Sequence, residues 1–318
     1  MDAAPEKLDC SLLMTTRRRF LAATGPTLAA IGSVSAQKSG DQDGKPLFSF
    51  GLMADCQYAD ADRVGSRFYR ESRPKLTEAV SELNRHELAF SFHLGDFIDK
   101  DFKSFADLKP ITAKLRSPLH HALGNHDFDV ADEFKARVPA ELGLNRTYYA
   151  IRKAGYRFLV IDTTEVSTYR YGPGDPRTSE AEAELRKIAG ARLPYAQNWN
   201  SRVSDAQLTW LTTQLEQASA AGESVLVLGH HPVVPEEVHC TWNRAALHDL
   251  FKQHKCCKAY FNGHRHSGGY ALKDGVHYLT LHGMLDTAQN AFATARLFPS
   301  RLEIRGFARQ PSRTLEFR

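Results

Sequence analysis

The feature that most constrains this 318-residue chain is a series of five apolar segments, each ending in side chains able to bind metal ions. Each segment has the length of a short buried β-strand and is followed within a few residues by Asp, Asn, Gln or His. In an α/β protein, polar groups at the carboxyl ends of buried strands project into the crevice where ligands bind. The five junctions lie at residues 53–57, 94–99, 122–127, 228–232 and 261–266.

The donor types favour a pair of hard metal ions over a structural zinc site. Oxygen and imidazole donors predominate, and the cysteine spacing offers no thiolate cluster. We therefore expect manganese, iron or magnesium, with zinc as an alternative. Asp96 is placed to bridge the pair, because one carboxylate can reach two cations. Two ions about 3.5–4 Å apart hold a hydroxide between them and stabilise both the attacking and the leaving oxygens of a phosphoryl group.

Alternating strands and helices followed by a run of strands predict an α/β fold of two packed sheets with helices outside. Strands are expected at residues 47–53, 88–94, 117–122, 224–228 and 257–261, and a hairpin at 147–152 and 157–162. Helices are expected at 68–85, 102–115, 204–221 and 243–254. Closing antiparallel strands are expected at 270–272, 277–282, 294–298 and 302–307. Residues 165–200, with one expected helix at 179–188, are interpreted as an insertion near the mouth of the site.

Residues 1–36 have the organisation of an export signal. Arginines 17–19 precede Phe20 and Leu21, a weakly apolar run covers 22–34, and small side chains at 34–36 fit a signal-peptidase site. The arginine pair before Phe-Leu resembles a twin-arginine leader, so the partner expected for the precursor is the twin-arginine export machinery. We therefore expect an exported, periplasmic or extracellular protein with no stable membrane anchor. A basic tail without a targeting role is the alternative.

The remaining sequence predicts one catalytic domain after a polar linker. Residues 37–46 contain no core-forming run, and residues 47–318 carry all five junctions. The net charge of +4 is too small and too scattered to indicate nucleic-acid binding. The cysteines match neither a zinc motif nor a disulfide framework, so we expect free thiols. A small anionic substrate is compatible with all of these features.

Taken in order, the five junctions resemble the motifs of the calcineurin-like metallophosphoesterases. Any one motif is weak by itself, but all five occur in the family's order over most of the chain after the leader. The motifs are Asp55-x-Gln57, Gly95-Asp96-x-x-Asp99, Gly124-Asn125-His126-Asp127, Gly229-His230-x-Pro232 and Gly263-His264-x-His266. The resemblance implies a four-layer α/β sandwich, in which two packed mixed β-sheets are flanked by α-helices.

One position departs from the general pattern and narrows the resemblance. The first motif is usually Asp-x-His, whereas Gln57 stands at its third position here. The manganese-dependent ADP-ribose/CDP-alcohol diphosphatases share this departure, and the chain also resembles them at 48–60, 240–247 and 263–270. A neutral amide oxygen can still bind a hard metal ion, but more weakly than an imidazole does. This second resemblance implies two manganese ions as the cofactor and a small nucleotide as the substrate.

The resemblance also implies roles for individual residues. One metal would be held by Asp55, Gln57, Asp96 and His266, and the other by Asp96, Asn125, His230 and His264. His126 would protonate the leaving oxygen, oriented by Asp127, while Asp99 would support the loop. Cys240 and Trp242 match a stretch near the family's nucleoside-binding region. Independently of the resemblance, Arg67 and Arg70 belong to an arginine cluster that is suited to clamp a phosphate.

These roles predict a hydrolase that cleaves the phosphoanhydride of nucleoside diphosphate-linked substrates, such as ADP-ribose and CDP-alcohols, with a metal-bridging hydroxide. A phosphodiesterase or phosphomonoesterase of the same superfamily, acting on cyclic nucleotides or other phosphoesters, is the alternative. The purple phosphatases need a tyrosine where this chain has Asp99, which argues against that type. A non-catalytic metal-binding scaffold is a third hypothesis, but such relatives typically lack the histidine found here at position 126.

Overall fold

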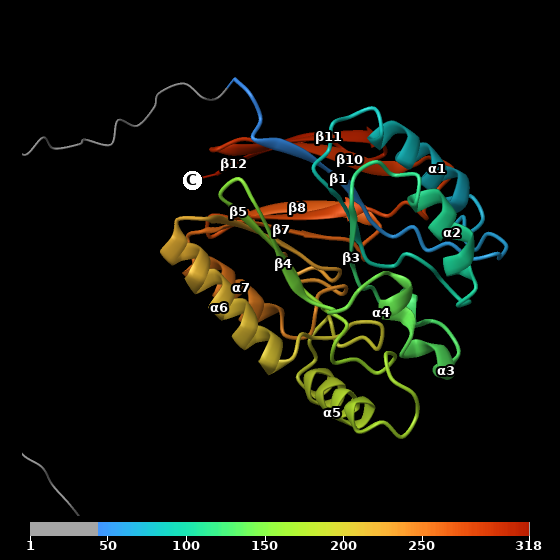
Figure 1. The fold of residues 1–318 in the computed structure, drawn as a ribbon. Helices are drawn as coiled ribbons and strands as arrows, with labels where there is room; N and C mark the ends of the chain where they lie inside the picture. Colours follow the sequence, from blue (N-terminus) through green and yellow to red (C-terminus); the bar gives the residue numbers. More distant parts are fainter. Residues whose placement is uncertain (1–43, 318) are drawn as a thin grey trace, which may run out of the picture. The chain divides into compact units, whose positions relative to one another are not determined.

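Two six-stranded β-sheets packed face to face form the centre of the fold (Figure 1). The computed structural model describes residues 44–317, so the expected leader (1–36) and residues 37–43 of the expected linker lie outside the described residues. The sheets and the helices outside them form the four-layer α/β sandwich that the sequence predicted.

The first sheet joins strands from the two ends of the described chain. Its order is β12-β11-β10-β1-β2-β3, with β1 parallel to β2 and β2 parallel to β3, while the remaining neighbours are antiparallel. The strands are β1 (Phe48–Met53), β2 (Ser91–Leu94), β3 (Leu119–Ala122), β10 (Ala291–Leu297), β11 (Arg301–Ala308) and β12 (Arg313–Glu316). Strand β12 was not predicted from the sequence.

The second sheet contains the expected hairpin and corrects the prediction for the closing strands. Its order is β4-β5-β6-β7-β9-β8. The strands are β4 (Tyr149–Lys153), β5 (Tyr156–Val160), β6 (Ser224–Leu228), β7 (Cys257–Asn262), β8 (Ser267–Lys273) and β9 (Val276–His282). The closing strands do not form one antiparallel set, because β9 pairs in parallel with β7 while β10 and β11 belong to the first sheet. Alternation of apolar residues predicts a strand but does not specify which sheet it joins.

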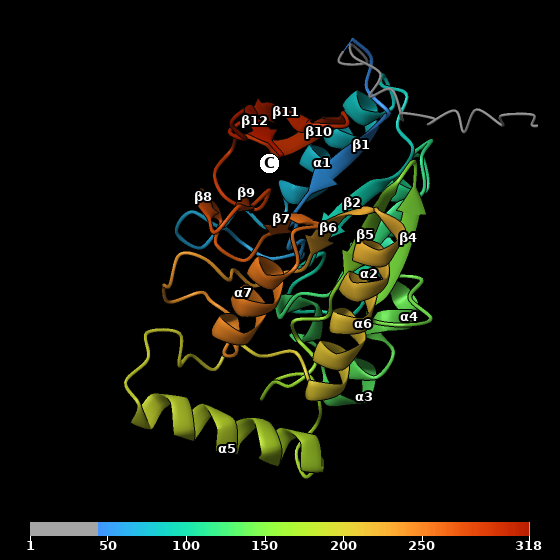
Figure 2. The same cartoon turned by 90° about the vertical axis from the view of Figure 1, so that its left-hand side faces the viewer.

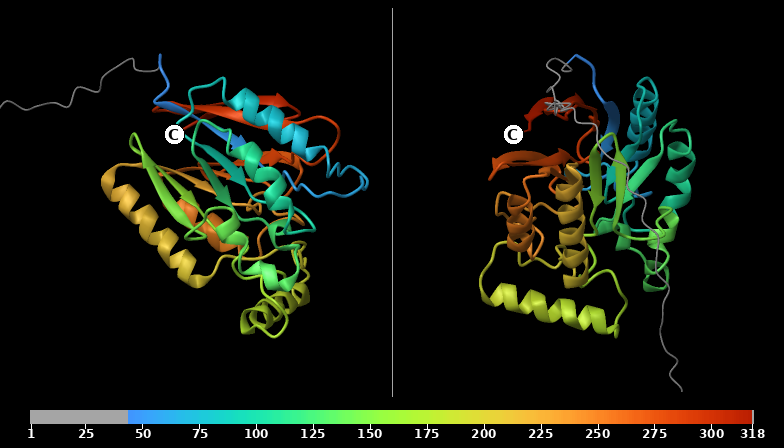
Figure 3. Two further views of the ribbon diagram at one scale, coloured as in Figure 1. Left: turned by 45° about the vertical axis from the view of Figure 1, so that its right-hand side comes forward. Right: turned by 60° about the vertical axis from the view of Figure 1, so that its left-hand side comes forward.

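The helices cover the outer faces of both sheets. Side chains of α1 (Ser72–Leu83) and α2 (Ser104–Thr112) pack against the first sheet, and those of α6 (Asp205–Ala221) and α7 (Arg244–Gln253) pack against the second. Figure 2 shows α6 and α7 side by side, with α5 (Pro176–Gly190) lying across the region below them; the right-hand view of Figure 3 shows the same arrangement. Ser204 caps α6 by accepting a hydrogen bond from the N–H of Gln207. The remaining helical turns are η1 (His126–Phe128), α3 (Asp132–Lys135) and α4 (Val138–Glu141).

A core rich in aromatic side chains holds the two sheets together. Phe50 of β1 packs edge-on against Phe158 of β5, with ring centroids 5.4 Å apart, and Phe92 of β2 stacks on the same ring at 5.7 Å. All three side chains are fully buried. Burying a phenylalanine side chain contributes about 1.5–3 kcal/mol to the stability of the folded state. Because the buried rings come from both sheets, their contacts hold one sheet against the other. The strand ends that carry the polar motifs are thereby held in place as well.

The four cysteines among the described residues are all free thiols, as their spacing predicted. In the part of the chain that the structure describes, no helix has both the length and the apolar composition needed to span a membrane.

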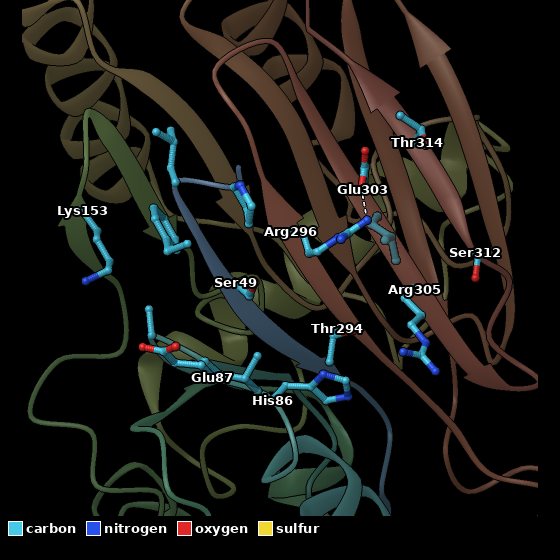
Figure 4. A pocket seen from close by; sticks show the side chains of 16 residues that line it. Ser49, His86, Glu87, Lys153, Thr294, Arg296, Glu303, Arg305, Ser312 and Thr314 are labelled. Carbon is cyan, nitrogen blue, oxygen red and sulfur yellow. Dashed lines mark hydrogen bonds and ion pairs between the residues drawn. The ribbon is translucent and has the colours of Figure 1, made fainter. Parts of the chain in front are cut away.

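A polar cavity of about 920 Å³ opens at the amino-terminal end of β1 (Figure 4). Lys153, Arg296 and Arg305 bring positive charge to it, and Arg296 is paired with Glu303. None of the expected metal ligands lines this cavity. Because β1 runs away from it toward the first polar motif, the cavity lies at the end of the sheet opposite the candidate site.

The buried histidines of the first sheet predict a loss of stability in acid. His121 of β3 is 7% exposed, and its Nδ1 has no hydrogen-bond partner among the described residues. Burial, together with the neighbouring His120, lowers the pKa of His121 to about 3. Between that pH and about 6.5, the unfolded chain binds a proton that the folded imidazole does not.

We therefore expect the wild type to lose stability relative to a His121→Leu variant as the pH falls below 6.5. The difference in free energy of unfolding between the two proteins should change by about 1.4 kcal/mol per pH unit. Between pH 6.5 and pH 5 the total change should be about 2 kcal/mol. Urea unfolding at pH 7.5 and at pH 5, with the same manganese concentration throughout, measures it. An unchanged difference between the two pH values would show that folding does not lower the pKa of His121.

Candidate metal centre and active site

The carboxyl ends of five parallel strands bring the predicted polar residues to one place. These strands are β1, β2 and β3 of the first sheet and β6 and β7 of the second. Asp55 and Gln57 follow β1, Asp96 follows β2, Asn125 and His126 follow β3, His230 follows β6, and His264 and His266 follow β7. The site therefore takes ligands from both sheets.

Asp96 lies at the centre of the cluster and belongs to two groups of potential metal ligands. One group is Asp55, Asp96 and His266, and the other is Asp96, His230 and His264; within each group the donor atoms lie within 4.8 Å of one another. The amide groups of Gln57 and Asn125 adjoin these groups. The Nε2 of Gln57 donates to the Oδ2 of Asp96 at 2.8 Å, and the Oδ1 of Asn125 lies 3.1 Å from the Nε2 of His230. Two sets of ligands that share one carboxylate are the arrangement expected for a dinuclear centre.

The polar atoms at the centre fit a pair of cations. The Oδ2 of Asp55 and the Oε1 of Gln57 are buried without a hydrogen-bond partner among the described residues, and such atoms cost free energy unless something binds them. Burial alone would raise the pKa of Asp96, but the imidazoles of His230 and His126 hold it well below its usual range. The carboxylate is therefore ionised, and it shares its negative charge between the two groups.

The backbone at the site is strained, and the strained turns bring the polar side chains close together. Asp55, Gln57, Asp96 and His264 all have positive φ, at 51°, 44°, 57° and 69°. This left-handed conformation costs a non-glycine residue on the order of 1–3 kcal/mol. Hydrogen bonds between the loops maintain it, including Asp55 N–H to the Gly95 carbonyl at 3.1 Å and Gln57 N–H to the Asp96 carbonyl at 2.8 Å. The chain turns sharply after each strand, which concentrates the side chains.

Two of the histidines are oriented by neutral oxygen atoms. The Nδ1 of His230 lies 2.8 Å from the Leu94 carbonyl, which can only accept, so Nδ1 donates and Nε2 faces Asp96 and Asn125. The Nε2 of His264 lies 3.0 Å from the Oδ1 of Asn200, whose NH₂ group donates to two backbone carbonyls. In both rings one nitrogen is therefore engaged as a donor and the other remains available to a metal ion.

His126 is paired with Asp99, and this corrects the prediction that Asp127 orients it. The Nδ1 of His126 lies 3.2 Å from the Oδ1 of Asp99. The Asp127 carboxylate instead accepts the backbone N–H groups of residues 96, 97, 98 and 124. Burial would lower the pKa of His126, but the carboxylates of Asp96 and Asp99 raise it above its usual value. The shift in the pKa of His126 is in the direction that favours the protonated imidazole, the form from which a general acid acts.

Comparison with known proteins agrees with this geometry. Residues 48–268 match the calcineurin-like phosphoesterase family. The chain belongs to the calcineurin-like phosphoesterases. This phosphoesterase is 32% identical over 297 residues to the manganese-dependent ADP-ribose/CDP-alcohol diphosphatase of Oryza sativa subsp. japonica, covering 82% of this chain and 92% of the relative. It is 28% identical to the enzyme of the same name from Mus musculus, covering 86% and 94% of the two chains.

A solved structure supports the same assignment. A dimetal phosphatase from Danio rerio superposes with a TM-score of 0.78 at 26% identity, covering 86% of this chain and 100% of that one. The family, the fold and the two groups that share Asp96 together identify this phosphoesterase as a metal-dependent hydrolase with a dinuclear centre.

A cavity of about 570 Å³ opens over the centre of this phosphoesterase. Asp96, Asn125, His126, His264 and His266 all line it. Pockets of 300–1,000 Å³ are typical for small ligands, so this volume accommodates a nucleotide.

Of the four side chains expected to bind substrate, only Arg67 lines this cavity. Arg70 is half exposed and forms ion pairs with Asp60 and Asp62 instead. Two nearby carboxylates thus neutralise the charge that its sequence position offered to a phosphate.

Cys240 and Trp242 do not line the cavity either and belong to a buried hydrophobic cluster. The indole N–H of Trp242 donates to the Gln197 carbonyl at 3.2 Å, and its backbone N–H donates to the Ser201 carbonyl at 2.8 Å. These contacts hold the segment that carries Trp199 and Asn200. Trp242 therefore supports a segment that lines the cavity and does not line the cavity itself.

Six residues that line the cavity were not predicted from the sequence. Two are small, Ser66 and Ser267, and four have larger side chains: Trp199, His239, Arg265 and Asp286. Trp199 is 41% exposed and comes from the least regular part of the sequence. Arg265 stands between His264 and His266, and this position alone was a signal that could have found it. For the other three larger side chains, no local pattern indicates that the fold brings them to the centre.

The different contacts of Asp99 and Asp127 predict different consequences for the same substitution. Asp127→Asn should destabilise the protein by about 3 kcal/mol or more, because buried N–H groups lose a charged acceptor. Asp99→Asn should leave the thermal midpoint nearly unchanged but lower turnover about 10-fold or more, by weakening the orientation and protonation of His126.

Thermal unfolding and turnover of the two variants test this distinction. The loss in Asp99→Asn should shrink with a nitrophenyl ester, whose leaving group needs no proton. Equal losses for leaving groups of very different pKa, or an Asp127→Asn variant as stable as the wild type, would contradict the assignment.

Proposed function

We propose that this phosphoesterase hydrolyses the phosphoanhydride bond of small nucleoside diphosphate-linked molecules, with ADP-ribose and CDP-alcohols as the substrate class. The main observation that supports this proposal is the pair of potential metal-ligand groups that share Asp96, at a cavity large enough for a nucleotide. Relatives that bear the name of this activity match from 82% to 86% of the chain, which supports the substrate class.

In this proposal, Asp55, Gln57, Asp96 and His266 hold one manganese ion, while Asp96, Asn125, His230 and His264 hold the other. When bound, such a pair supplies positive charge to the phosphoryl oxygens and lowers the pKa of a water molecule. The contribution of the chain is to keep Asp96 ionised, to orient the imidazoles and to fix the buried amide oxygen of Gln57.

His126 is the proton donor to the leaving oxygen, and Asp99 keeps its imidazole oriented and charged. Its position supports this role, because His126 lines the cavity and its backbone N–H donates to the Oδ1 of Asp96 at 2.8 Å. The proton donor is thereby held beside the centre. Arg67, which lines the same cavity, is the cation that contacts the second phosphate.

Trp199 is the surface on which the base of the substrate stacks. Its exposed indole lines the cavity, and the hydrogen bond between its carbonyl and the Nε2 of His231, at 3.3 Å, fixes its backbone. An aromatic platform held in this way binds a base at low entropic cost, and stacking contributes about 1–3 kcal/mol per base.

A substrate panel tests the proposed activity directly. ADP-ribose, CDP-choline, CDP-glycerol, cyclic nucleotides and nitrophenyl phosphate are compared with manganese, magnesium and zinc. We expect the two classes of diphosphate to give the highest kcat/KM, with manganese. Faster hydrolysis of a cyclic nucleotide or of a monoester would favour a phosphodiesterase or a phosphomonoesterase instead.

The stacking role predicts a substrate-dependent loss in Trp199→Ala. Its kcat/KM for ADP-ribose should fall about 10-fold, because the base loses its platform. P1,P2-dimethyl diphosphate, which has the anhydride without a base, should be hydrolysed as by the wild type. Trp199→Phe is the matched control and should retain most activity toward both. The same fractional loss on both substrates would remove Trp199 from base recognition.

We also propose that the chain is exported in its folded form by the twin-arginine route. The support is the sequence of residues 1–36, with paired arginines before Phe20-Leu21 and a small-residue cleavage site. Manganese binds weakly in the divalent series, so an enzyme that folds around it before export keeps ions that it acquired in the cytoplasm.

Replacing Arg17 and Arg18 by Lys should keep the precursor in the cytoplasm, still active. Activity measured in periplasmic and cytoplasmic fractions of cells expressing each form checks this. Equal periplasmic activity in both, or an exported protein with an intact amino terminus, would contradict the proposed leader.

A further inference from the structure

Asp286 distinguishes the third histidine of the centre from the other two. The nitrogen atoms that orient His230 and His264 are engaged by neutral oxygen atoms. In His266 the corresponding nitrogen, Nδ1, lies 3.3 Å from a carboxylate oxygen, the Oδ1 of Asp286. The side chains are only 13% and 17% exposed, so water weakens this contact little.

The contact leaves the other nitrogen of His266 facing the metal ligands. Its Nε2 lies 3.8 Å from the Oδ1 of Asp55, in the group that also includes Asp96. A carboxylate that accepts from one imidazole nitrogen fixes the tautomer and makes the other nitrogen a stronger donor to a metal. The same proposed ion site contains Gln57, a neutral amide where related motifs have imidazole.

The segment that carries Asp286 is fixed on several sides. The Oγ of Ser66 donates to the Oδ1 of Asp286 at 3.2 Å. The Leu285 N–H donates to the Asp55 carbonyl at 2.8 Å, which ties the segment to the first metal-binding loop. The Gly283 N–H donates to the His266 carbonyl at 3.0 Å, and a Cβ at Gly283 would lie 2.8 Å from the Cγ of His266.

A buried lysine from α1 completes this support. The Nζ of Lys75 donates to the carbonyls of Met284, Leu285 and Thr287 at 2.8, 3.2 and 2.6 Å. Lys75 is 5% exposed, and these three carbonyls satisfy all three hydrogens of its ammonium group. The carbonyls come from the residues on both sides of Asp286, so Lys75 fixes the backbone from which its carboxylate projects.

We propose that Asp286 is a positioning residue for the metal centre: it fixes the ring of His266, strengthens its donor nitrogen and so compensates for the neutral Gln57 in the same ion site. Lys75 serves this role indirectly by clamping residues 284–287. The inference rests on the proposed ligand set, in which His266 and Gln57 share one ion.

Manganese titration of the metal-free protein, followed by electron paramagnetic resonance, tests the inference without an activity measurement. The wild type should bind two ions and give an exchange-coupled signal. In Asp286→Ala, one ion should bind with unchanged affinity and the other about 10- to 100-fold more weakly. Asp286→Asn keeps an acceptor but loses the charge and should lie between the two, while Asp286→Glu should recover most of the affinity.

A matched control removes a carboxylate from a histidine outside the centre. Asp274 lies 3.0 Å from the Nε2 of His248, which belongs to neither ligand group, so Asp274→Ala should bind both ions as the wild type does. Lys75→Met should weaken the same ion as Asp286→Ala and also lower the thermal midpoint. Circular dichroism verifies folding, and if Asp286→Ala does not fold, the Asn and Glu variants decide the question.

Each remaining outcome overturns a defined part of the inference. Unchanged binding of both ions in Asp286→Ala, or equal weakening of both, would reject Asp286 as the positioning residue of one site while leaving the proposed reaction intact. A wild type that binds fewer than two manganese ions would instead reject the ligand set, and with it both the proposed function and this inference.

Discussion

The structure depends on stabilising one buried negative charge. Asp96 is fully buried, and an ionised carboxylate in that environment costs several kcal/mol unless partners compensate it. Compensation comes from β3 and its loop through the His126 N–H, from the loop after β1 through Gln57, and from the loop after β6 through His230. The parallel strands β1, β2 and β3 of the first sheet and β6 and β7 of the second have their carboxyl ends at the same site, which is why the compensating groups can converge.

Bringing so many loops to one carboxylate requires close backbone contacts. A Cβ at Gly95 would lie 2.4 Å from the Nδ1 of His230, and one at Gly124 would lie 2.2 Å from the Asp96 backbone nitrogen. Only glycine permits these approaches. Asp127 then binds the backbone N–H groups of the two loops that carry Asp96 and Asn125. The stability of the fold and the geometry of the centre are therefore coupled, since the same hydrogen bonds serve both.

The environment of the centre is asymmetric, and the asymmetry comes from distant parts of the chain. The irregular segment before α6 supplies Asn200 to His264, and the segment after β9 supplies Asp286 to His266. A neutral amide at one imidazole and a carboxylate at another give the two ions different donor strengths. On the proposed assignment, the carboxylate serves the ion that Gln57 binds, so the weaker ligand and the stronger histidine act together.

The sequence by itself determined the family, the two-sheet fold and the residues that gather around Asp96. These are local signals, because a strand of a few apolar residues and the polar residues directly after it occupy one short stretch of chain. The sequence did not determine which sheet the closing strands join, since alternation of apolar residues is the same in either sheet. Nor did it show that His126 meets Asp99 instead of its chain neighbour Asp127. That choice follows from four backbone N–H groups, which occupy Asp127 only once the loops are packed. Trp199, Asp286 and Lys75 have no local pattern, because their roles depend on contacts between segments far apart in the chain, and only the tertiary structure decided those.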